Sequence, residues 1–350
     1  MSAAISAHEA IRRVLGREAL SRIEMEAVIG QLMDEQGDWD HAKIAALLVG
    51  LAMKGETVSE IAGAAAAMRA RVIAIPHDVP DVVDTCGTGG DGKGSFNVST
   101  AAAVVTAAAG IPVAKHGNRS VSSRSGSADV LAALGVDVEL TPEDAARALA
   151  EIDIAFLFAP KLHPAIKAVM PVRKSLGVRT LFNVLGPLTN PAGARRQVMG
   201  VYAESLVEPL GLVLAELGAE HALVVHGSDG LDEITTTGPS TVAEVHRGEV
   251  KSWQLDPAEY GVARATADDL LGGSPEENAA DFTAVLDPDR AMPRIRALRD
   301  IVAVNAAAAI WVGGGVDDYA SGLARAHELL ASGAAAAKLD DLRRFGRLKP

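Results

Sequence analysis

The sequence predicts an α/β protein, in which a small amino-terminal helical domain precedes a larger α/β domain with a mostly parallel central sheet flanked by helices. From Ala7 to about Ile75 the hydrophobic spacing is helical, with no strand-like alternation. Beyond about residue 77, short apolar runs alternate with helical patterns, which is typical of a parallel sheet covered on both faces. Hydrophobic residues make up 49% of the chain but aromatic residues only 3%, and such small aliphatic side chains allow helices to pack closely on a sheet.

The helical region carries recognisable start and stop signals. Asp40 is a candidate N-cap and Gly55 a candidate stop for one helix. Thr57 or Ser59 opens the next helix. The following stretch, IPHDVPDVVD, contains two prolines and indicates a boundary. We therefore expect a helical domain over residues 1–76 and an α/β domain over residues 77–350.

In the second region, six short apolar runs predict strands and four patterns between them predict helices. The predicted strands are Val82–Val83, Ile111–Ala114, Val136–Leu140, Ile154–Phe158, Val198–Tyr202 and Ala222–Val225. The predicted helices are Thr100–Ala109, Ser127–Leu134, Glu143–Ile152 and Glu204–Leu217. A hairpin around Arg247 and Gly248 is expected at an edge of the sheet, and the chain from Asp268 onward is helical again.

The charge and cysteine content exclude several classes of protein. A formal net charge of −12 argues against a general binder of nucleic acids or anionic membranes, which would present a basic face. Cys86 is the only cysteine, which excludes an internal disulfide and fits a reducing compartment. The first residues contain no continuous apolar stretch of the signal-peptide kind, and the apolar run Val302–Val316 is too short to span a bilayer. We expect a cytoplasmic protein without nucleic-acid or membrane partners.

Three loops follow predicted strands and are candidates for a shared site. They begin at Gly87, at Lys115 and at Gly227. Ligands of open α/β sheets bind beyond the carboxyl ends of the strands, so we expect the three loops to meet at one edge of the sheet.

The first loop, CGTGGDGKGSFNVST, matches two phosphate-loop patterns incompletely. A dinucleotide site needs its third glycine to open a helix directly and an acidic residue after the next strand, but that strand ends in Lys115 and His116. A triphosphate loop needs Ser or Thr where Gly94 stands, and Asp91 would repel a closely held phosphate. With both patterns excluded, the stretch is interpreted as a glycine loop that leads into the start of a helix. Asn97, Ser99 and Thr100 at this start either contact an anion or simply cap the helix.

The second loop is strongly basic and rich in serine. Lys115, His116, Asn118, Arg119 and Arg124 lie among five serines within KHGNRSVSSRSGS. In an acidic protein such a cluster would repel itself unless it held something negative. Two phosphate groups, one on each of the first two loops, would satisfy both.

The third loop contains adjacent carboxylates, Asp232 and Glu233. By itself such a pair is usually an exposed acidic turn. Next to a polyphosphate site it suits a hard divalent cation, since Mg²⁺ between carboxylates and phosphate removes their repulsion and activates the leaving group.

These motifs together resemble those of the anthranilate phosphoribosyltransferase family of tryptophan biosynthesis, whose fold is related to that of the nucleoside phosphorylases. The resemblance is carried by DTCGTGGDGKGSFNVST, AKHGNRSVSSRSGSADVLAALGV, HPAIKAVMPVRKSLGVRTLFNVLGPLTNP and GLDEITTTG, in the family's order. Ser95 stands where the family more usually has Thr, and Val98 where it more usually has Ile; both changes are conservative.

The resemblance implies a fold, a reaction and an assembly. Residues of roughly 163–180 would join the helical domain, the active site would lie between the two domains, and dimers would form through the helical domain. The substrates would be anthranilate and 5-phosphoribosyl 1-diphosphate, and the products N-(5-phosphoribosyl)anthranilate and diphosphate.

The resemblance also implies roles for individual residues. Lys115, His116 and Asn118 would be the catalytic residues, Gly87, Asn118 and Arg173 would contact anthranilate, and Ser99, Asp232 and Glu233 would hold Mg²⁺. Residues expected to bind the phosphoribosyl diphosphate are Gly87, Gly90, Asp91, Ser95, Asn97, Val98, Ser99, Thr100, Lys115, His116, Gly117, Asn118, Arg119, Ser120, Val121, Ser122, Ser123 and Ser127.

The residue types suit that chemistry. Loss of diphosphate from C1 of the ribose develops negative charge that Mg²⁺ and Lys115 can neutralise, and an arylamine is already neutral, so no strong general base is required. Without the family, Arg173 would be assigned to a solvated helix face together with Lys174 and Arg179. His163 either lines the route of the substrate or caps a helix, and we expect Cys86 to be a small buried residue without a nucleophilic role.

Two other functions are compatible with parts of this pattern. A pyrimidine nucleoside phosphorylase would use inorganic phosphate and would need no carboxylate pair for a metal. A catalytically silent relative that binds nucleic acid would need a basic groove, which the net charge of −12 makes difficult.

Overall fold

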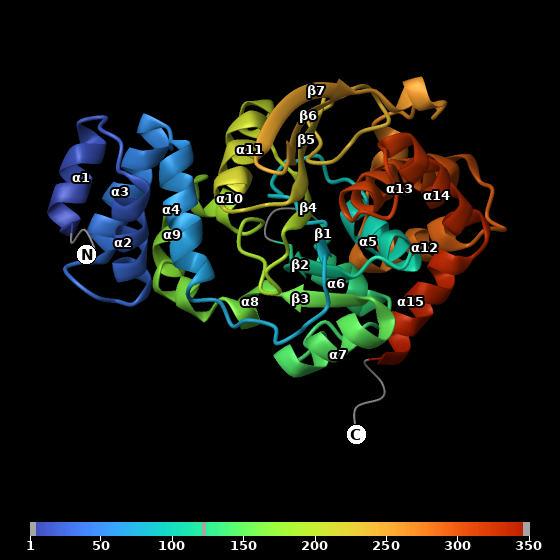
Figure 1. Cartoon of the computed structure of the whole chain (residues 1–350), viewed down its shortest axis with the longest axis horizontal. Helices are drawn as coiled ribbons and strands as arrows, with labels where there is room; N and C mark the ends of the chain where they lie inside the picture. Colours follow the sequence, from blue (N-terminus) through green and yellow to red (C-terminus); the bar gives the residue numbers. More distant parts are fainter. Residues whose placement is uncertain (1–4, 121–123, 346–350) are drawn as a thin grey trace.

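The computed structural model describes residues 5–120 and 124–345, and it has two parts (Figure 1). Four helices form a bundle at one end of the molecule: α1 (Ala7–Leu15), α2 (Arg22–Met33), α3 (His41–Lys54) and α4 (Val58–Arg69). The remainder is a larger α/β domain around a seven-stranded sheet. The predicted fold class, a small helical domain followed by a larger α/β domain, is confirmed.

The helix ends in the bundle follow the predicted signals. Asp40 caps α3 by accepting a hydrogen bond from the Lys43 amide at 2.8 Å, and Gly55 ends that helix. Thr57, rather than Ser59, opens α4. It forms a capping box with Glu60, whose buried carboxylate also accepts a hydrogen bond from the Leu20 amide. Satisfying the free amide groups in this way stabilises the helix start.

The sheet has the strand order β3-β2-β1-β4-β5-β6-β7. The first five strands in that order are parallel, while β6 and β7 are antiparallel. Their bounds are β1 (Val83–Asp84), β2 (Val113–Gly117), β3 (Ile154–Phe158), β4 (Arg196–Gly200), β5 (His221–Gly227), β6 (Ser240–His246) and β7 (Glu249–Leu255). The hairpin predicted at Arg247 and Gly248 joins β6 to β7, and β7 is an edge strand, as expected.

The helices that follow the bundle in the chain are α5 (Val98–Ala108), α6 (Ser127–Ala133), α7 (Pro142–Ile152), α8 (Ala159–Leu162), α9 (Met170–Leu176), α10 (Phe182–Leu185), α11 (Val207–Glu216), α12 (Pro275–Leu286), α13 (Pro293–Val312), α14 (Tyr319–Ala331) and α15 (Ala334–Phe345). Short 3₁₀ helices are η1 (Pro164–Ala168), η2 (Glu204–Leu206), η3 (Pro257–Tyr260) and η4 (Asp268–Leu270). The predicted return to helices after Asp268 is confirmed.

Two hydrophobic clusters cover opposite faces of the central sheet. Leu223 and Val225 of β5 point to one face, which packs against α5 and α13. Ala222 and Val224, the alternate residues of the same strand, point to the other face, which packs against α11. Since successive strand residues face opposite ways, both faces of β5 are apolar, as expected of a strand covered on both sides.

The helical bundle and the α/β domain share one of these clusters. Val169 and Val172 lie in the same cluster as Leu47 and Leu48 of α3. The segment η1–α9 therefore packs against the bundle, with η1 on α2 and α9 on α3, although it follows β3 in the chain (Figure 1).

One predicted strand is wrong. Residues 136–140 have no strand partner. Val136, Val138 and Leu140 are buried and the residues between them are more exposed, which produced the alternating pattern. The segment buries its apolar side chains as an extended connection between α6 and α7, because the sheet position beside β2 is taken by β3.

No helix within the described ranges is long and apolar enough to cross a membrane.

Candidate active site

The loops that follow β1, β2 and β5 meet at the carboxyl edge of the parallel strands. The Gly89 amide of the first loop donates to Asp232 of the third at 2.8 Å, and the Ser99 amide donates to Glu233 at 3.1 Å. Lys115 of β2 reaches the first loop, where its Nζ donates to the Thr85 carbonyl at 2.6 Å. The predicted convergence of the three loops is confirmed.

The glycine loop is held in place from two sides. Gly89, Gly90, Gly92 and Gly94 all have positive φ, a conformation that residues with a side chain seldom adopt. On one side, the loop is hydrogen-bonded to the end of η4 and the residues after it. The Phe96 amide donates to the Leu270 carbonyl, and the Gly272 amide donates to the Gly94 carbonyl. On the other side, Arg179 donates to the Gly90 carbonyl and its guanidinium stacks 4.0 Å from the Tyr202 ring centroid.

Asn97 stands at the N-cap of α5 but does not cap it. Its side chain makes no capping hydrogen bond. Instead its Nδ2 donates to the Ser125 carbonyl at 3.2 Å, and its Oδ1 accepts from Asn278 at 2.8 Å. Asn97 thus joins the glycine loop to the basic loop, which removes the capping interpretation for this residue.

The side chains of the basic loop have partners within the chain. Arg119 forms an ion pair with Asp129 at 3.0 Å, and Arg124 with Glu277 at 3.6 Å. Asp129 also accepts hydrogen bonds from the Ser120 and Gly126 amides at 2.9 and 3.0 Å. Part of the positive charge is therefore balanced by carboxylates that lie outside the basic stretch of the sequence.

Lys115 is the cation of this loop that lies deepest in the protein. Its side chain is buried. Besides Thr85, its ammonium approaches the Ser99 hydroxyl at 3.4 Å. No ion pair of Lys115 with a carboxylate lies within 4 Å among the residues described by the structure. A buried, hydroxyl-bound ammonium at the carboxyl end of β2 is suited to neutralising an anionic ligand.

The acidic pair lies in an unfavourable electrostatic environment. Burial raises the pKa of Asp232, and the nearby Asp91 raises it further. Burial and the Asp232 carboxylate likewise raise the pKa of Glu233. One carboxylate oxygen of Asp91, Oδ2, is buried without a hydrogen-bond partner. Three crowded carboxylates, one with an unsatisfied oxygen, fit a hard divalent cation, since such an ion removes both the repulsion and the missing contact.

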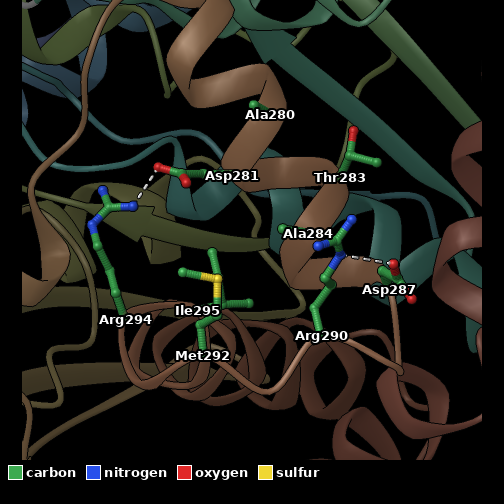
Figure 2. Close-up of a pocket in the computed structure, with 9 residues that line it drawn as sticks. All are labelled: Ala280, Asp281, Thr283, Ala284, Asp287, Arg290, Met292, Arg294 and Ile295. Carbon is green, nitrogen blue, oxygen red and sulfur yellow. Dashed lines mark hydrogen bonds and ion pairs between the residues drawn. The ribbon is translucent and has the colours of Figure 1, made fainter.

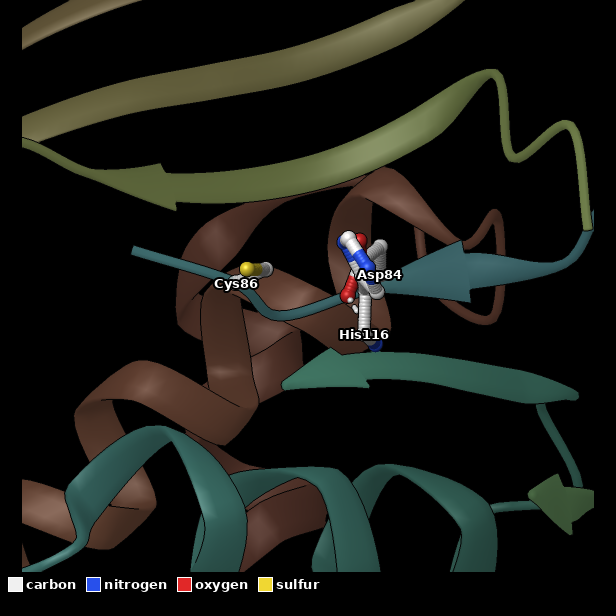
Figure 3. Close-up of side chains that lie close together, drawn as sticks. All are labelled: Asp84, Cys86 and His116. Carbon is white, nitrogen blue, oxygen red and sulfur yellow. Dashed lines mark hydrogen bonds between the residues drawn. The ribbon is translucent and has the colours of Figure 1, made fainter. Parts of the chain in front are cut away.

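Asp84 at the end of β1, Cys86 at the start of the glycine loop and His116 of β2 lie close together (Figure 3). Both oxygens of Asp84 already accept hydrogen bonds, from the His116 amide at 3.1 Å and from Asn190 at 2.7 Å. Burial raises the pKa of Asp84 to about 6 and that of the Cys86 thiol far above its ordinary value. The hydrogen bond from the His116 amide to Asp84 therefore joins the end of β1 to β2, and Cys86 is not an activated nucleophile.

His116 forms a pair with His163. Their Nε2 atoms are 3.1 Å apart and their ring centroids 5.0 Å apart. Burial lowers the pKa of His116 to about 3 and that of His163 to about 4. Both rings are therefore neutral near pH 7, and one donates its proton to the other. His163 contacts a site residue rather than serving as a helix cap, since it makes no side-chain cap bond.

Arg173 lies on α9 beside Phe182, with its guanidinium 5.4 Å from the ring centroid. Its guanidinium donates to the Met170 sulfur at 3.7 Å but makes no ion pair among the described residues, and burial lowers its pKa. An unpaired, half-buried guanidinium is unusual for a solvated helix face, so this interpretation of Arg173 is not supported.

The remaining predicted residues belong to the first two loops and to the helix starts that follow them, and three of them are not described by the structure. Val121, Ser122 and Ser123 lie outside the described residues. The first loop and the start of α5 hold Gly87, Gly90, Asp91, Ser95, Val98 and Thr100; the end of β2 and the basic loop hold Gly117, Asn118, Arg119, Ser120 and Ser127. The Ser127 hydroxyl donates to the Asn118 carbonyl at 3.1 Å, which closes the base of the basic loop.

Sequence reasoning missed residues that hold these loops. Arg179 lies within the motif HPAIKAVMPVRKSLGVRTLFNVLGPLTNP, but only the fold shows that its guanidinium donates to the Gly90 carbonyl. Asp129 follows the serine run closely enough to have been noticed as the loop's own counter-charge. Asn190 binds Asp84 and Asn278 binds Asn97. Both pairs are distant in the sequence, so no local pattern predicts these contacts.

A shallow depression of about 350 Å³ on α12 and α13 is unrelated to this site (Figure 2). Its arginines are paired, Arg294 with Asp281 at 2.6 Å and Arg290 with Asp287 at 3.5 Å. It therefore offers no free cation to a phosphate.

Comparisons with known proteins agree with this geometry. Residues 79–336 match the "Glycosyl transferase family, a/b domain", and residues 8–72 match the "Glycosyl transferase family, helical bundle domain". The chain is 50% identical over 339 residues to the anthranilate phosphoribosyltransferase of Laribacter hongkongensis, a match that covers 97% of each protein.

Solved structures of related proteins share the fold over nearly the whole chain. The anthranilate phosphoribosyltransferase of Thermus thermophilus has a TM-score of 0.90 and 44% identity, over 97% of this chain and 99% of that one. The Saccharomyces cerevisiae enzyme in complex with PRPP and Mg has a TM-score of 0.87 and 27% identity, over 97% and 98%. The same yeast enzyme in complex with 4-fluoroanthranilate has a TM-score of 0.86 and 26% identity, over 97% of each chain. With this similarity over nearly its whole length, the chain belongs to the anthranilate phosphoribosyltransferase family.

Proposed function

We propose that this protein transfers the 5-phosphoribosyl group of 5-phosphoribosyl 1-diphosphate to the amine of anthranilate, giving N-(5-phosphoribosyl)anthranilate and diphosphate in tryptophan biosynthesis. The observation that carries the proposal is the convergence of Lys115, the glycine loop and the Asp232–Glu233 pair at one edge of the sheet. The relatives from Laribacter and Thermus are named for this reaction, and the yeast relative has been solved with PRPP and Mg.

The phosphoribosyl diphosphate would lie across the glycine and basic loops. Its diphosphate would contact the first loop and the start of α5, and its 5-phosphate the segment from Asn118 to Ser127. Support for this comes from Asn97, which bonds both Ser125 and Asn278 and so ties the first loop to the second. Because this contact holds the two loops at a fixed distance before a ligand binds, a ligand that bridges them loses less loop entropy on binding.

Asp232, Glu233 and Ser99 would hold Mg²⁺. The fit rests on the crowded carboxylates and on the partnerless Asp91 oxygen. When bound, the ion would supply charge neutralisation on the diphosphate leaving group. The Gly89 and Ser99 amides hold the two carboxylates in place.

Lys115 would neutralise charge that appears on the leaving group as the bond to C1 of the ribose breaks. Its ammonium is already oriented by the Thr85 carbonyl and the Ser99 hydroxyl, so little rearrangement is needed during the reaction. The segment that contains Lys115 also carries His116 and Asn118, which would line the sugar and the amine.

Anthranilate would be oriented rather than deprotonated. Arg173, which has no carboxylate partner among the described residues, would pair with the anthranilate carboxylate. Gly87 and Asn118 would contact the same substrate. His116 and His163 are neutral near pH 7 and can exchange hydrogen bonds without adding charge. Holding the amine against C1 can supply about 7–11 kcal/mol of the barrier in favourable cases.

The protein would act as a homodimer in the cytoplasm. Leu15, Ile23 and Met53, on α1, α2 and α3, are 61–73% exposed, which supports an interface on the helical domain. A Met53→Glu variant should shift the mass measured by light scattering from dimer toward monomer. The single cysteine fits a reducing compartment such as the cytoplasm, and this location stays a prediction.

The direct test is anthranilate fluorescence. Purified protein should consume the signal only when Mg²⁺ and 5-phosphoribosyl 1-diphosphate are both present. A parallel reaction with a pyrimidine nucleoside and inorganic phosphate examines the phosphorylase alternative. Turnover in that reaction, with none on anthranilate, would refute the proposal.

A further inference from the structure

Three metal-ligating side chains lie together at the opposite edge of the sheet from the candidate active site. His221 begins β5, and His246 ends β6. In the antiparallel pairing of these strands His221 lies directly opposite His246, and Leu223 lies opposite Glu244. Residues directly opposite share a face, as do residues two apart on one strand. His221, Glu244 and His246 therefore project from one face of the sheet.

The distances between these side chains suit a single ion. Nε2 of His221 is 3.1 Å from a carboxylate oxygen of Glu244. The ligand atoms of all three residues lie within 4.8 Å of one another. Tetrahedral ligands at about 2.0–2.1 Å from zinc lie roughly 3.3 Å apart, so the His221–Glu244 pair already has this spacing and only the third ligand must move.

That third ligand is free to move. His246 is exposed at the end of its strand, and its ring stacks on His221 with centroids 4.6 Å apart. A small rotation of the exposed ring would bring its nitrogen to the same ion. Water can occupy the fourth position on this open side.

The other two ligands are held more firmly. The His221 side chain is only 7% exposed and that of Glu244 20%. The Trp311 ring of α13 packs on the His221 ring in a T-shaped contact, with centroids 5.0 Å apart. A pre-oriented ligand loses little side-chain entropy when an ion binds.

The neighbouring charges leave Glu244 available. On β7, Glu249 lies opposite His246 and Lys251 lies opposite Glu244, but Lys251 pairs with Glu249 at 3.4 Å. The nearby Glu220 carboxylate is paired with Arg196 at 2.7 Å. Among the described residues, His221 is the only ion-pair partner of Glu244.

We propose that His221, Glu244 and His246 bind a zinc-class divalent transition-metal ion, separate from the catalytic Mg²⁺. Two imidazoles and one carboxylate favour zinc over the hard Mg²⁺, which prefers oxygen ligands. The ion would clamp β5 to β6 at the amino end of β5, whereas the catalytic loops leave the carboxyl ends of β1, β2 and β5. It therefore stabilises the antiparallel edge of the sheet and takes no part in phosphoribosyl transfer.

The test is zinc titration calorimetry on untagged, metal-free protein. Zinc also binds carboxylates, so the titration uses an Asp232→Asn/Glu233→Gln background, in which the two expected carboxylate ligands of Mg²⁺ are absent. We expect one zinc per chain. His246→Ala and Glu244→Gln should each weaken zinc binding by at least about ten-fold. Even residues that only hydrogen-bond to metal ligands typically lower the metal affinity by about 10–100-fold when they are replaced. These two residues are the more exposed ligands, so both variants should fold.

The matched control is His41→Ala, which removes an exposed histidine from the start of α3 and should leave the affinity unchanged. In the otherwise wild-type protein, zinc should raise the unfolding temperature, and His246→Ala should abolish that shift while leaving turnover with Mg²⁺ unaltered. Absence of zinc binding in the background variant, or equal affinity with and without His246 and Glu244, would overturn the proposal.

Discussion

Gly200 and Asp232 are packed so closely that a Cβ atom on Gly200 would lie 1.6 Å from the Asp232 carbonyl oxygen. Gly200 is the last residue of β4, and Asp232 belongs to the acidic turn after β5. The backbone of the acidic turn thus lies directly against the backbone of a central strand. This contact explains how a turn on the surface edge of a sheet keeps its side chains aimed at the glycine loop.

Gly200→Ala should therefore displace the acidic turn. We expect a loss of about 1–3 kcal/mol in the free energy of unfolding, as for other overpacked sites, together with a higher Mg²⁺ requirement. Urea denaturation and Mg²⁺-dependent turnover measure the two effects. The control is Gly186→Ala, where an added Cβ meets nothing within 4 Å and φ is −51°. If both variants behave alike, close packing at Gly200 is not what positions the turn.

Replacement of the acidic pair by Asp232→Asn/Glu233→Gln should lower kcat by about 10²–10³-fold, the range expected for loss of one preorganised electrostatic contact. The amide oxygens can still accept from Gly89 and Ser99, so the fold should survive. Removing crowded carboxylates should even raise the unfolding temperature of the metal-free protein at neutral pH. Scanning calorimetry with and without Mg²⁺ checks this, and Asp268→Asn at an exposed site is the control. Undiminished turnover in the double variant would refute the metal assignment.

Lys115→Met should lower kcat by about 10²–10³-fold with little change in anthranilate KM. The methionine chain fills similar space but offers no charge to the diphosphate. Steady-state kinetics at saturating Mg²⁺ provide the measurement, with Lys161→Met, on an exposed helix end, as the control. A change in KM alone would mean that Lys115 contributes to binding and not to the transition state.

Arg173→Ala should raise anthranilate KM by roughly 10–100-fold, which corresponds to about 1.5–3 kcal/mol for hydrogen bonds to a charged group. The KM for phosphoribosyl diphosphate should stay near its original value. Lys174→Ala, which removes the exposed neighbouring cation, is the matched control. Equal losses for both substrates would contradict the assigned role.

The His116–His163 pair should make stability depend on pH. The folded pKa of His163 is about 4, below the ordinary value of 6.5 that the unfolded chain regains. The unfolded state therefore binds more protons at pH 5, and the contribution of His163 is lost as pH falls from about 6.5 toward 4. At pH 5 the loss is about 2 kcal/mol.

His163→Gln isolates this contribution, because glutamine does not titrate. Asp84, whose pKa is raised to about 6, makes the protein more stable as pH falls and so opposes the effect of His163. The measurement is therefore the difference in unfolding free energy between wild type and variant, from urea denaturation at pH 7 and at pH 5. We expect the variant to lose less stability than wild type on acidification. Identical losses would show that His163 is not held neutral by burial.

Several features were predictable because their signals are local. The capping residues Asp40 and Thr57, the turn at Arg247 and Gly248, and the glycine loop depend on backbone geometry that neighbouring residues dictate. The alternation of Val136, Val138 and Leu140 is also local, and it predicted a strand that does not form. Burial of alternate side chains requires only an extended segment, whereas a strand also requires a free sheet edge, and β3 occupies that edge.

The partners of the site residues were not predictable in this way. Asn97 lies at a helix start, yet Ser125 and Asn278 satisfy its side chain, and Asn278 is 181 residues away in the sequence. The sequence alone shows no counter-charge for Arg124, but α12 brings Glu277 within 3.6 Å of it. Such pairings depend on which elements the sheet order places side by side.

The sequence by itself determined most of the elements of this protein, the three loops that carry its chemistry and the family to which it belongs, because periodicity, caps and motif spacing are properties of a few consecutive residues. Only the tertiary structure decided that Gly200 supports Asp232, that His163 meets His116, and that His221 faces Glu244 and His246. These contacts join distant segments, and they form because the apolar faces of the strands and helices can be buried together in this one arrangement.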